Sequence, residues 1–77
     1  MNDYHLGSEI HNELIRQGRS VTWLAGQLNC NRMNVYDIFQ RKSMDVELVA
    51  RISLLLHRNF LKEISLHLDN CLVDVVK

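Results

Sequence analysis

The sequence predicts an all-α fold in which five helices form a single domain. Apolar residues recur every three or four positions along most of the chain, proline is absent, and β-branched runs occur only near the C-terminus. A length of 77 residues is sufficient for one domain and too short for two. Hydrophobic residues make up 47% of the chain, which is enough for one compact core. We expect that core to lie within residues 6–68, followed by a tail at 69–77.

The first predicted helix covers about residues 6–17. Its apolar residues recur every four positions and form one face, consisting of Leu6, Ile10 and Leu14. Ser8 is a plausible N-cap if the helix begins after Leu6. Gly18 ends the helix, because glycine adopts the left-handed conformation without penalty.

The second and third helices are predicted to begin after Ser20 and Asn31, two residue types that favour the N-cap position. The second carries a compact apolar stripe of Val21, Leu24, Ala25 and Leu28. Asn29 follows it, and asparagine tolerates a left-handed turn. The third helix extends to about Gln40, and its expected inward residues are Val35, Ile38 and Phe39.

The fourth helix is predicted from Val46 to about His57, with Asp45 as its N-cap, and the fifth from Phe60 to about Leu68, with Asn59 as its N-cap. The fourth should bury Val46, Leu48, Val49, Ile52, Leu55 and Leu56. The fifth should bury Phe60, Leu61, Ile64 and Leu68. The tail at 69–77 is apolar and β-branched, so it could form a strand, extend the helix or fray. It is also a candidate dimer contact.

The charges are unevenly distributed although they sum to zero. Residues 1–15 contain three acidic residues and no Lys or Arg, whereas residues 16–42 contain five basic residues against Asp37 alone. A concentration of positive charge is typical of a nucleic-acid-binding surface, while zero net charge argues weakly against one. Chance clustering on a solvated surface is the alternative interpretation.

No pattern for catalysis or metal binding is present. We find no Ser-His-Asp or Cys-His arrangement and no glycine-rich phosphate loop, so we expect no enzyme, no catalytic residue and no small-molecule ligand. The histidines lack metal-ligand spacing with cysteine, so we expect no metal and no cofactor. Cys30 is expected to pack in the core. The few cysteines, and first residues unlike a secretory signal, predict a cytoplasmic protein, and the longest apolar run is too short for a membrane span.

The most informative stretch is residues 21–40, where two predicted helices meet at a sharp turn. Such a turn needs a small residue where the helices cross, which is Ala25, and four positions later a residue that tolerates positive φ, which is Asn29. Val35 and Ile38 follow the alanine by ten and thirteen positions and would lock the second helix. A tight corner of this kind leaves the outer face of its second helix free to enter a major groove.

A family resemblance rests on this corner and on the helices that flank it. The residues that carry it are Ser20, Leu24, Ala25, Leu28, Asn29, Cys30, Asn31, Arg32, Val35 and Ile38, followed by Asp45, Val49, Ile52 and Leu56. The pattern resembles the helix-turn-helix of the phage-repressor family (Cro/C1, or XRE) over about residues 6–65. The resemblance implies a lambda-repressor-like DNA-binding domain with its helix-turn-helix at helices two and three. It also implies a transcription regulator that binds double-stranded DNA as a homodimer.

By this resemblance the third helix reads bases. Arg32 could pair bidentately with guanine, and Tyr36 could pack against a thymine methyl or bond a phosphate. Arg19 lies where the family's second helix faces a phosphate. The implied DNA-binding residues are Arg19, Ser20, Asn31, Arg32, Met33, Asn34, Tyr36, Asp37, Gln40, Arg41 and Lys42.

Two functions from different classes remain open. One is sequence-specific DNA binding as a repressor, activator or antitoxin. The other is a protein-interaction module, or an antitoxin-like partner protein, that keeps the fold with weak or no DNA binding. Zero net charge, the acidic Asp37, the apolar tail and Val21, where the family commonly has glutamine, favour the second. DNA binding requires the basic residues of the middle third on one face, whereas an interaction module requires an exposed apolar patch around residues 60–76.

Overall fold

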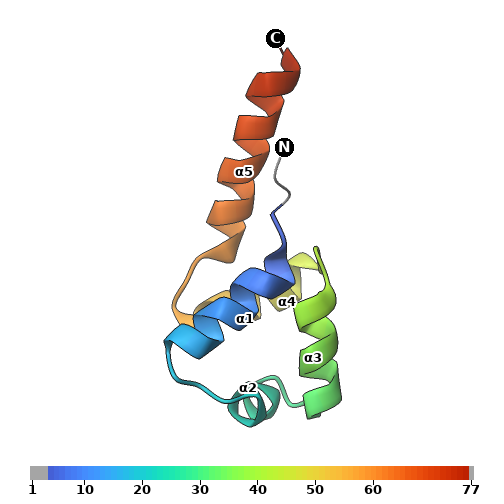
Figure 1. Ribbon diagram of the computed structural model, residues 1–77, viewed down its shortest axis with the longest axis vertical. Helices are drawn as coiled ribbons and strands as arrows, with labels where there is room; N and C mark the ends of the chain where they lie inside the picture. Colours follow the sequence, from blue (N-terminus) through green and yellow to red (C-terminus); the bar gives the residue numbers. More distant parts are fainter. Residues whose placement is uncertain (1–3, 77) are drawn as a thin grey trace.

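The computed structural model describes residues 4–76, with side chains over 4–68, and contains five α-helices and no strand in that range (Figure 1). The helices are α1 (Leu6–Arg16), α2 (Val21–Gln27), α3 (Arg32–Gln40), α4 (Val46–Leu56) and α5 (Phe60–Val76). This confirms the predicted all-α fold. Helices α1–α4 form a compact body from which α5 projects, and the molecule measures 45 × 22 × 21 Å. Within the described range no helix is both long and apolar enough to cross a membrane.

A single hydrophobic core joins the five helices. Its fully buried side chains are Leu6, Ile10, Leu14, Leu24, Val35, Val49, Ile52, Leu56 and Phe60. Burial of each such side chain is worth roughly 1.5–3 kcal/mol. Helix α3 packs against both α1 and α2, and α4 packs against α5. The inward faces predicted for the first and third helices are confirmed, as are Leu24, Ala25 and Leu28 of the second.

Three of the predicted N-caps are confirmed. The side chains of Ser20, Asn31 and Asn59 each accept a hydrogen bond from the backbone N–H three residues on, at 2.9, 2.9 and 3.0 Å. Both predicted left-handed positions are also present, with φ of 70° at Gly18 and 56° at Asn29. The boundaries of α2 and α3 therefore follow from local side-chain chemistry.

Other helix ends differ from the prediction. His5, and not Ser8, caps α1, because its Nδ1 atom accepts a hydrogen bond from the Ser8 backbone N–H at 3.1 Å. Asp45 occupies the N-cap position of α4 without a side-chain hydrogen bond to that helix. Helix α4 ends one residue earlier than predicted, because His57 adopts the left-handed conformation with φ of 55°.

Two residues predicted to be buried are exposed. Val46 is 68% exposed and Leu68 is 54% exposed. Val46 is the first residue of α4, and Leu68 belongs to α5, the helix that projects from the body (Figure 1). Apolar periodicity shows which face of a helix is apolar, but it does not show how far the opposing helices extend along that face.

The predicted tail continues α5 as a helix to Val76, so the strand alternative is wrong and the fifth helix is longer than predicted. A helix satisfies its own backbone hydrogen bonds, whereas a strand at this position would have no neighbouring strand to pair with among the described residues. The predicted dimer contact at 69–77 rests on side chains that lie outside the described residues.

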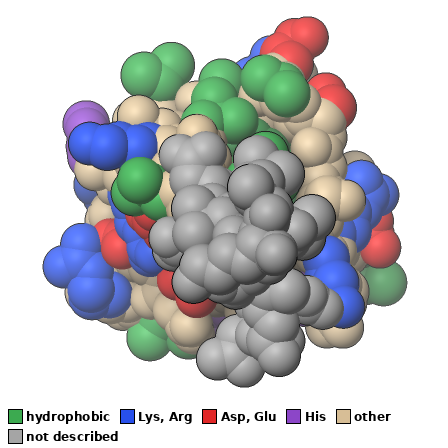
Figure 2. All heavy atoms as spheres, turned by 90° about the horizontal axis from the view of Figure 1, so that it is seen from above, with side chains coloured by type: hydrophobic (Ala, Val, Ile, Leu, Met, Phe, Trp, Pro, Cys, Tyr) green, Lys and Arg blue, Asp and Glu red, His purple; other side chains and the backbone are tan. Residues whose placement is uncertain are grey.

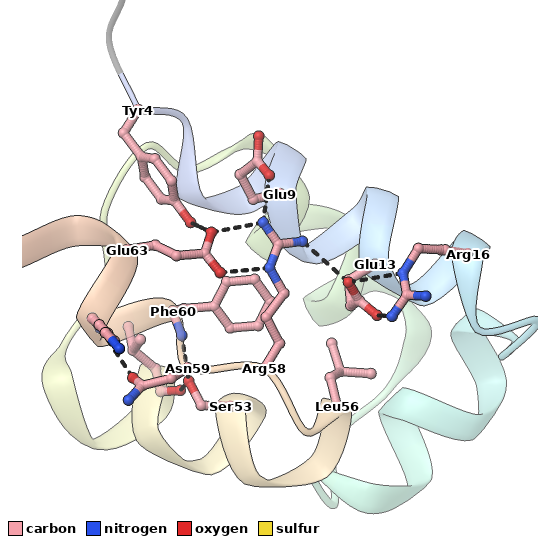
Figure 3. Close-up of polar contacts among 12 residues, drawn as sticks. Tyr4, Glu9, Glu13, Arg16, Ser53, Leu56, Arg58, Asn59, Phe60 and Glu63 are labelled. Atoms are coloured by element: carbon pink, nitrogen blue, oxygen red, sulfur yellow. Dashed lines mark hydrogen bonds and ion pairs between the residues drawn. The ribbon is translucent and has the colours of Figure 1, made fainter. Parts of the chain in front are cut away.

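A cluster of charged side chains joins α1 to the start of α5 (Figure 3). Arg58, in the loop between α4 and α5, donates hydrogen bonds to Glu9 (2.8 Å), to Glu13 (3.2 Å) and to Glu63 (2.6 Å). These four residues form the Arg58 cluster. Tyr4 extends it by donating a hydrogen bond to Glu63 at 2.9 Å. The cluster fixes the loop that carries the chain from the body into α5.

The N-terminus of α1 packs directly against the C-terminal end of α3. The backbone N–H of Gly7 donates to the carbonyl oxygen of Arg41 at 2.9 Å, and that of Leu6 donates to the carbonyl oxygen of Lys42 at 3.3 Å. A β-carbon on Gly7 would lie only 2.4 Å from the carbonyl oxygen of Ile38. Helix α3 therefore lies against α1 at a separation that only glycine permits.

Candidate nucleic-acid interface

Helix α3 buries one face and exposes the other. Val35, Ile38 and Phe39 face the core. A rotation of about 100° per residue places the remaining residues of the first two turns on the opposite side. Met33 is 74% exposed and Tyr36 is 51% exposed, so the outer face of α3 carries large apolar side chains as well as polar ones.

All eleven residues predicted to bind DNA are exposed. Nine of them lie between Asn31 and Lys42, on α3 or at its two ends, while Arg19 and Ser20 lie at the start of α2. The turn between the two helices is closed by a 2.9 Å hydrogen bond from the Cys30 backbone N–H to the Ala25 carbonyl oxygen. Cys30 itself is half-buried against the core. The fold thus brings most of the predicted residues together on and around one short helix.

Several of these side chains already have partners within the chain. The side-chain oxygens of Ser20 and Asn31 accept the capping hydrogen bonds of α2 and α3, so these two residues position the helices. Asp37 accepts hydrogen bonds from Arg41 Nη2 at 2.6 Å and Nε at 3.1 Å. The side chain of Arg32, by contrast, has no hydrogen bond or ion pair with any described residue. Its cationic group therefore remains available to an external partner.

Arg19 and Trp23 form a contact that the sequence did not reveal. The Arg19 guanidinium carbon lies 4.3 Å from the centre of the Trp23 ring, within the range of a cation–π interaction. Trp23 is half-buried against the core. The ring orients Arg19 just ahead of α2, while the residue as a whole stays exposed.

Tyr36 is supported from behind by a second aromatic arrangement. Its ring meets Phe39 edge-on, with ring centres 6.3 Å apart and planes at 80°. Phe39 in turn stacks on His11 of α1, with ring centres 4.2 Å apart and planes at 11°. Edge-to-face and stacked aromatic pairs favour a defined ring orientation. A signal for His11 was absent from the sequence, because nothing in it placed α1 beside Phe39.

A shallow hollow of about 330 Å³ lies beside α3. Its lining residues are Leu28, Cys30, Asn34, Asp37, Ile38, Arg41 and Leu48. The only charged groups in it are Asp37 and Arg41, which pair with each other. Over the described part of the chain, no three His, Cys, Asp or Glu side chains lie together in a way that could hold a metal ion.

Comparison with known proteins gives no matching family model, no matching curated protein and no matching solved structure. The likeness to the phage-repressor family therefore remains a resemblance carried by the residues of α2, α3, their turn and the helices that flank them.

Proposed function

We propose that the chain is a sequence-specific DNA-binding transcriptional regulator, in which α2 and α3 form a helix-turn-helix of the phage-repressor type. The observation that carries the proposal is the outer face of α3, which is exposed along its length while α1 and α2 hold the opposite face. A single helix fits the major groove, which is about 12 Å wide. The first turn of such a helix contacts base edges.

The charge around α3 supports this function although the chain is neutral overall. Arg32 stands at the first position of α3, where the helix dipole disfavours a cation. An anionic partner such as DNA would offset the unfavourable interaction between Arg32 and the helix dipole. In the major groove, guanine offers two hydrogen-bond acceptors to an arginine. Arg19 ahead of α2, and Arg41 and Lys42 after α3, lie where they would contact phosphates.

The regulator is proposed to act in the cytoplasm as a homodimer. One helix reads only a few base pairs, so two copies on a palindromic site are expected, with half-sites about 34 Å apart. Helix α5 supports dimerisation, because it projects from the body (Figure 1). Its side chains Leu66 and Leu68 are both 54% exposed. A homodimer that uses α5 would leave the α3 face of each subunit open to DNA.

Enrichment of a random DNA library on the protein, followed by mobility-shift titration, tests the proposal. We expect a palindromic site whose affinity falls steeply with salt, with a log–log slope of roughly −5 for a dimer in which Arg19, Arg41 and Lys42 of each subunit contact phosphates. Arg32→Ala should weaken binding at least tenfold, as expected for loss of a base contact worth about 1–3 kcal/mol. Arg51→Ala is the matched control, because it removes an exposed helical arginine from α4. A folded protein that retains no DNA at low salt would contradict the proposal.

Asp37→Asn should increase DNA affinity about fivefold. The substitution removes a negative charge from the reading face and releases Arg41, and two unit charges 4 Å apart in water interact by about 1 kcal/mol. Folding stability should fall by only about 0.3–0.5 kcal/mol, because the lost ion pair is exposed. Glu47→Gln removes an acidic partner of the same kind from α4 and should change affinity less. Weaker binding by Asp37→Asn would instead show that Asp37 accepts a hydrogen bond from DNA, as a cytosine amino group would allow.

Protein binding is the second candidate function, and a largely apolar groove favours it. The groove has a volume of about 400 Å³, and its lining residues are Tyr4, Leu6, Lys42, Ser43, Met44, Val46, Val49, Leu61, Ile64 and His67. Figure 2 looks onto this end of the molecule and shows hydrophobic side chains together with side chains of both charges. Failure of the DNA experiment with a folded protein would leave this groove as the best-supported binding surface.

A further inference from the structure

Apolar side chains lie at the centre of the outer face of α3, where they would contact bases. Met33 and Tyr36 are separated by three positions, so they lie about 60° apart around the helix axis and are side-by-side neighbours. Met33 is 74% exposed and Tyr36 is 51% exposed, and both belong to the first turn and a half of α3. Exposed apolar residues are common singly, but this pair stands next to Arg32 on the face that would enter the groove.

Most polar groups near this pair are unsuited to base readout. The side-chain oxygen of Asn31 caps α3, and Asp37 is held by Arg41. Asn34 lies on the flank of the helix and lines the hollow beside it. Gln40 lies in the last turn of α3, whereas the N-terminal residues of a recognition helix contact the bases. Arg32 therefore remains as the main hydrogen-bonding reader.

Tyr36 is held in a defined orientation before DNA arrives. Phe39 contacts its ring edge-on, and Phe39 is fixed in turn by the core and by the stacked ring of His11. Such support lowers the entropy lost when Tyr36 binds. Met33 is unbranched and flexible, so it can adapt to the surface beside the fixed ring.

Resting on the proposed DNA binding, we propose that Met33 and Tyr36 together read thymine C5-methyl groups next to a guanine bound by Arg32. The thymine methyl is the only apolar group that a base pair presents in the major groove, and no other base carries one. Contact between this methyl group and the side chains of Met33 and Tyr36 would favour thymine over cytosine, because cytosine has no such methyl group. Each half-site should then contain thymine adjacent to the guanine read by Arg32.

Deoxyuridine substitution in the enriched duplex tests this inference, because it deletes the methyl group and leaves base pairing unchanged. Binding by the wild-type protein should weaken about fourfold for each contacted methyl group, and the same substitution outside the half-sites should have little effect. Met33→Ala and Tyr36→Ala should each bind the thymine and deoxyuridine duplexes more equally than the wild type does. Arg32→Ala is the matched control, because it should bind more weakly and still prefer thymine to deoxyuridine.

The outcomes separate this inference from the proposed function. Tight binding with equal affinity for thymine and deoxyuridine duplexes would overturn methyl readout and leave DNA binding standing. An enriched site without thymine in its half-sites would do the same. No DNA retention by a folded protein would overturn the proposed function, and methyl readout with it. Both side chains are exposed, so the alanine variants should fold as the wild type does.

Discussion

Gly7→Ala should destabilise the protein by about 3 kcal/mol or more. The added β-carbon would lie 2.4, 2.5 and 2.6 Å from the carbonyl oxygens of Ile38, Phe39 and Arg41. All three are backbone atoms near the end of α3, so no side-chain rotation can relieve the overlap. Either α1 or α3 has to move, and the hydrogen bond from Gly7 to Arg41 is lost with that movement.

A loss of this size is large relative to the total stability of a domain of this length. A chain of 77 residues has a free energy of unfolding of about 4–12 kcal/mol. A loss of 3 kcal/mol lowers the melting temperature by more than about 12 °C, which thermal denaturation followed by circular dichroism would measure. DNA affinity should fall as well, because α1 holds the end of α3.

Gly26→Ala is the control for the glycine substitution. Gly26 lies within α2, and a β-carbon there would meet no atom within 4 Å. Alanine should therefore stabilise the protein by about 0.5–1 kcal/mol, because it has the higher helix propensity. Equal melting temperatures for Gly7→Ala and the wild type would contradict the close approach of α1 to α3.

Acidification should destabilise the protein through Glu13, the one charged side chain that is buried among the described residues, at 4% exposed. Hydrogen bonds from Arg16, and then from Gln17 and Arg58, lower the pKa of Glu13 from 4.5 to about 2 against the opposing effect of burial. Arg58 likewise lowers the pKa of Glu63. As the pH falls, the unfolded chain therefore protonates Glu13 at a higher pH than the folded protein does. The stability that Glu13 contributes is complete above about pH 4.5 and is lost as the pH falls toward about 2.

Glu13→Ala should lower the free energy of unfolding by about 1.5–3 kcal/mol at pH 7, as expected when a buried carboxylate that accepts hydrogen bonds from Arg16, Gln17 and Arg58 is removed. Arg58 would keep Glu9 and Glu63, and Arg16 is exposed, so no buried charge is left without a partner. Urea denaturation at pH 7 and at pH 3 measures both effects. The difference between the two pH values should be smaller in the variant than in the wild type.

Glu47→Gln is the control for the acid effect. Glu47 is exposed and lies 3.8 Å from Arg51 on the surface of α4, so its loss should change stability by less than about 1 kcal/mol at pH 7. It should leave the acid destabilisation of the wild type in place. If Glu13→Ala showed the same loss of stability between pH 7 and pH 3 as the wild type, Glu13 would not be its source.

Features set by neighbours in the chain could be predicted from the sequence. The caps at Ser20, Asn31 and Asn59 and the left-handed turns at Gly18 and Asn29 depend on hydrogen bonds and dihedral angles within a few residues. The inward faces of α1 and α3 follow from apolar spacing alone. The same spacing placed Arg32, Met33 and Tyr36 on the exposed side of α3, so the candidate interface was predictable as a set of exposed positions.

Features set by the packing of distant segments were decided only by the tertiary structure. Glu13 carries a charge that favours the surface, and the partner that stabilises it in the core, Arg58, comes from the loop after α4, 45 residues further along the chain. Gly7 looks like any helical glycine until the carbonyl oxygens at the end of α3 are placed against it. His11 stacks on Phe39 of α3 only because α1 passes beside that residue. Local sequence fixes the backbone and the direction of each side chain, whereas burial and contact depend on which segment packs opposite, and that is a property of the whole fold.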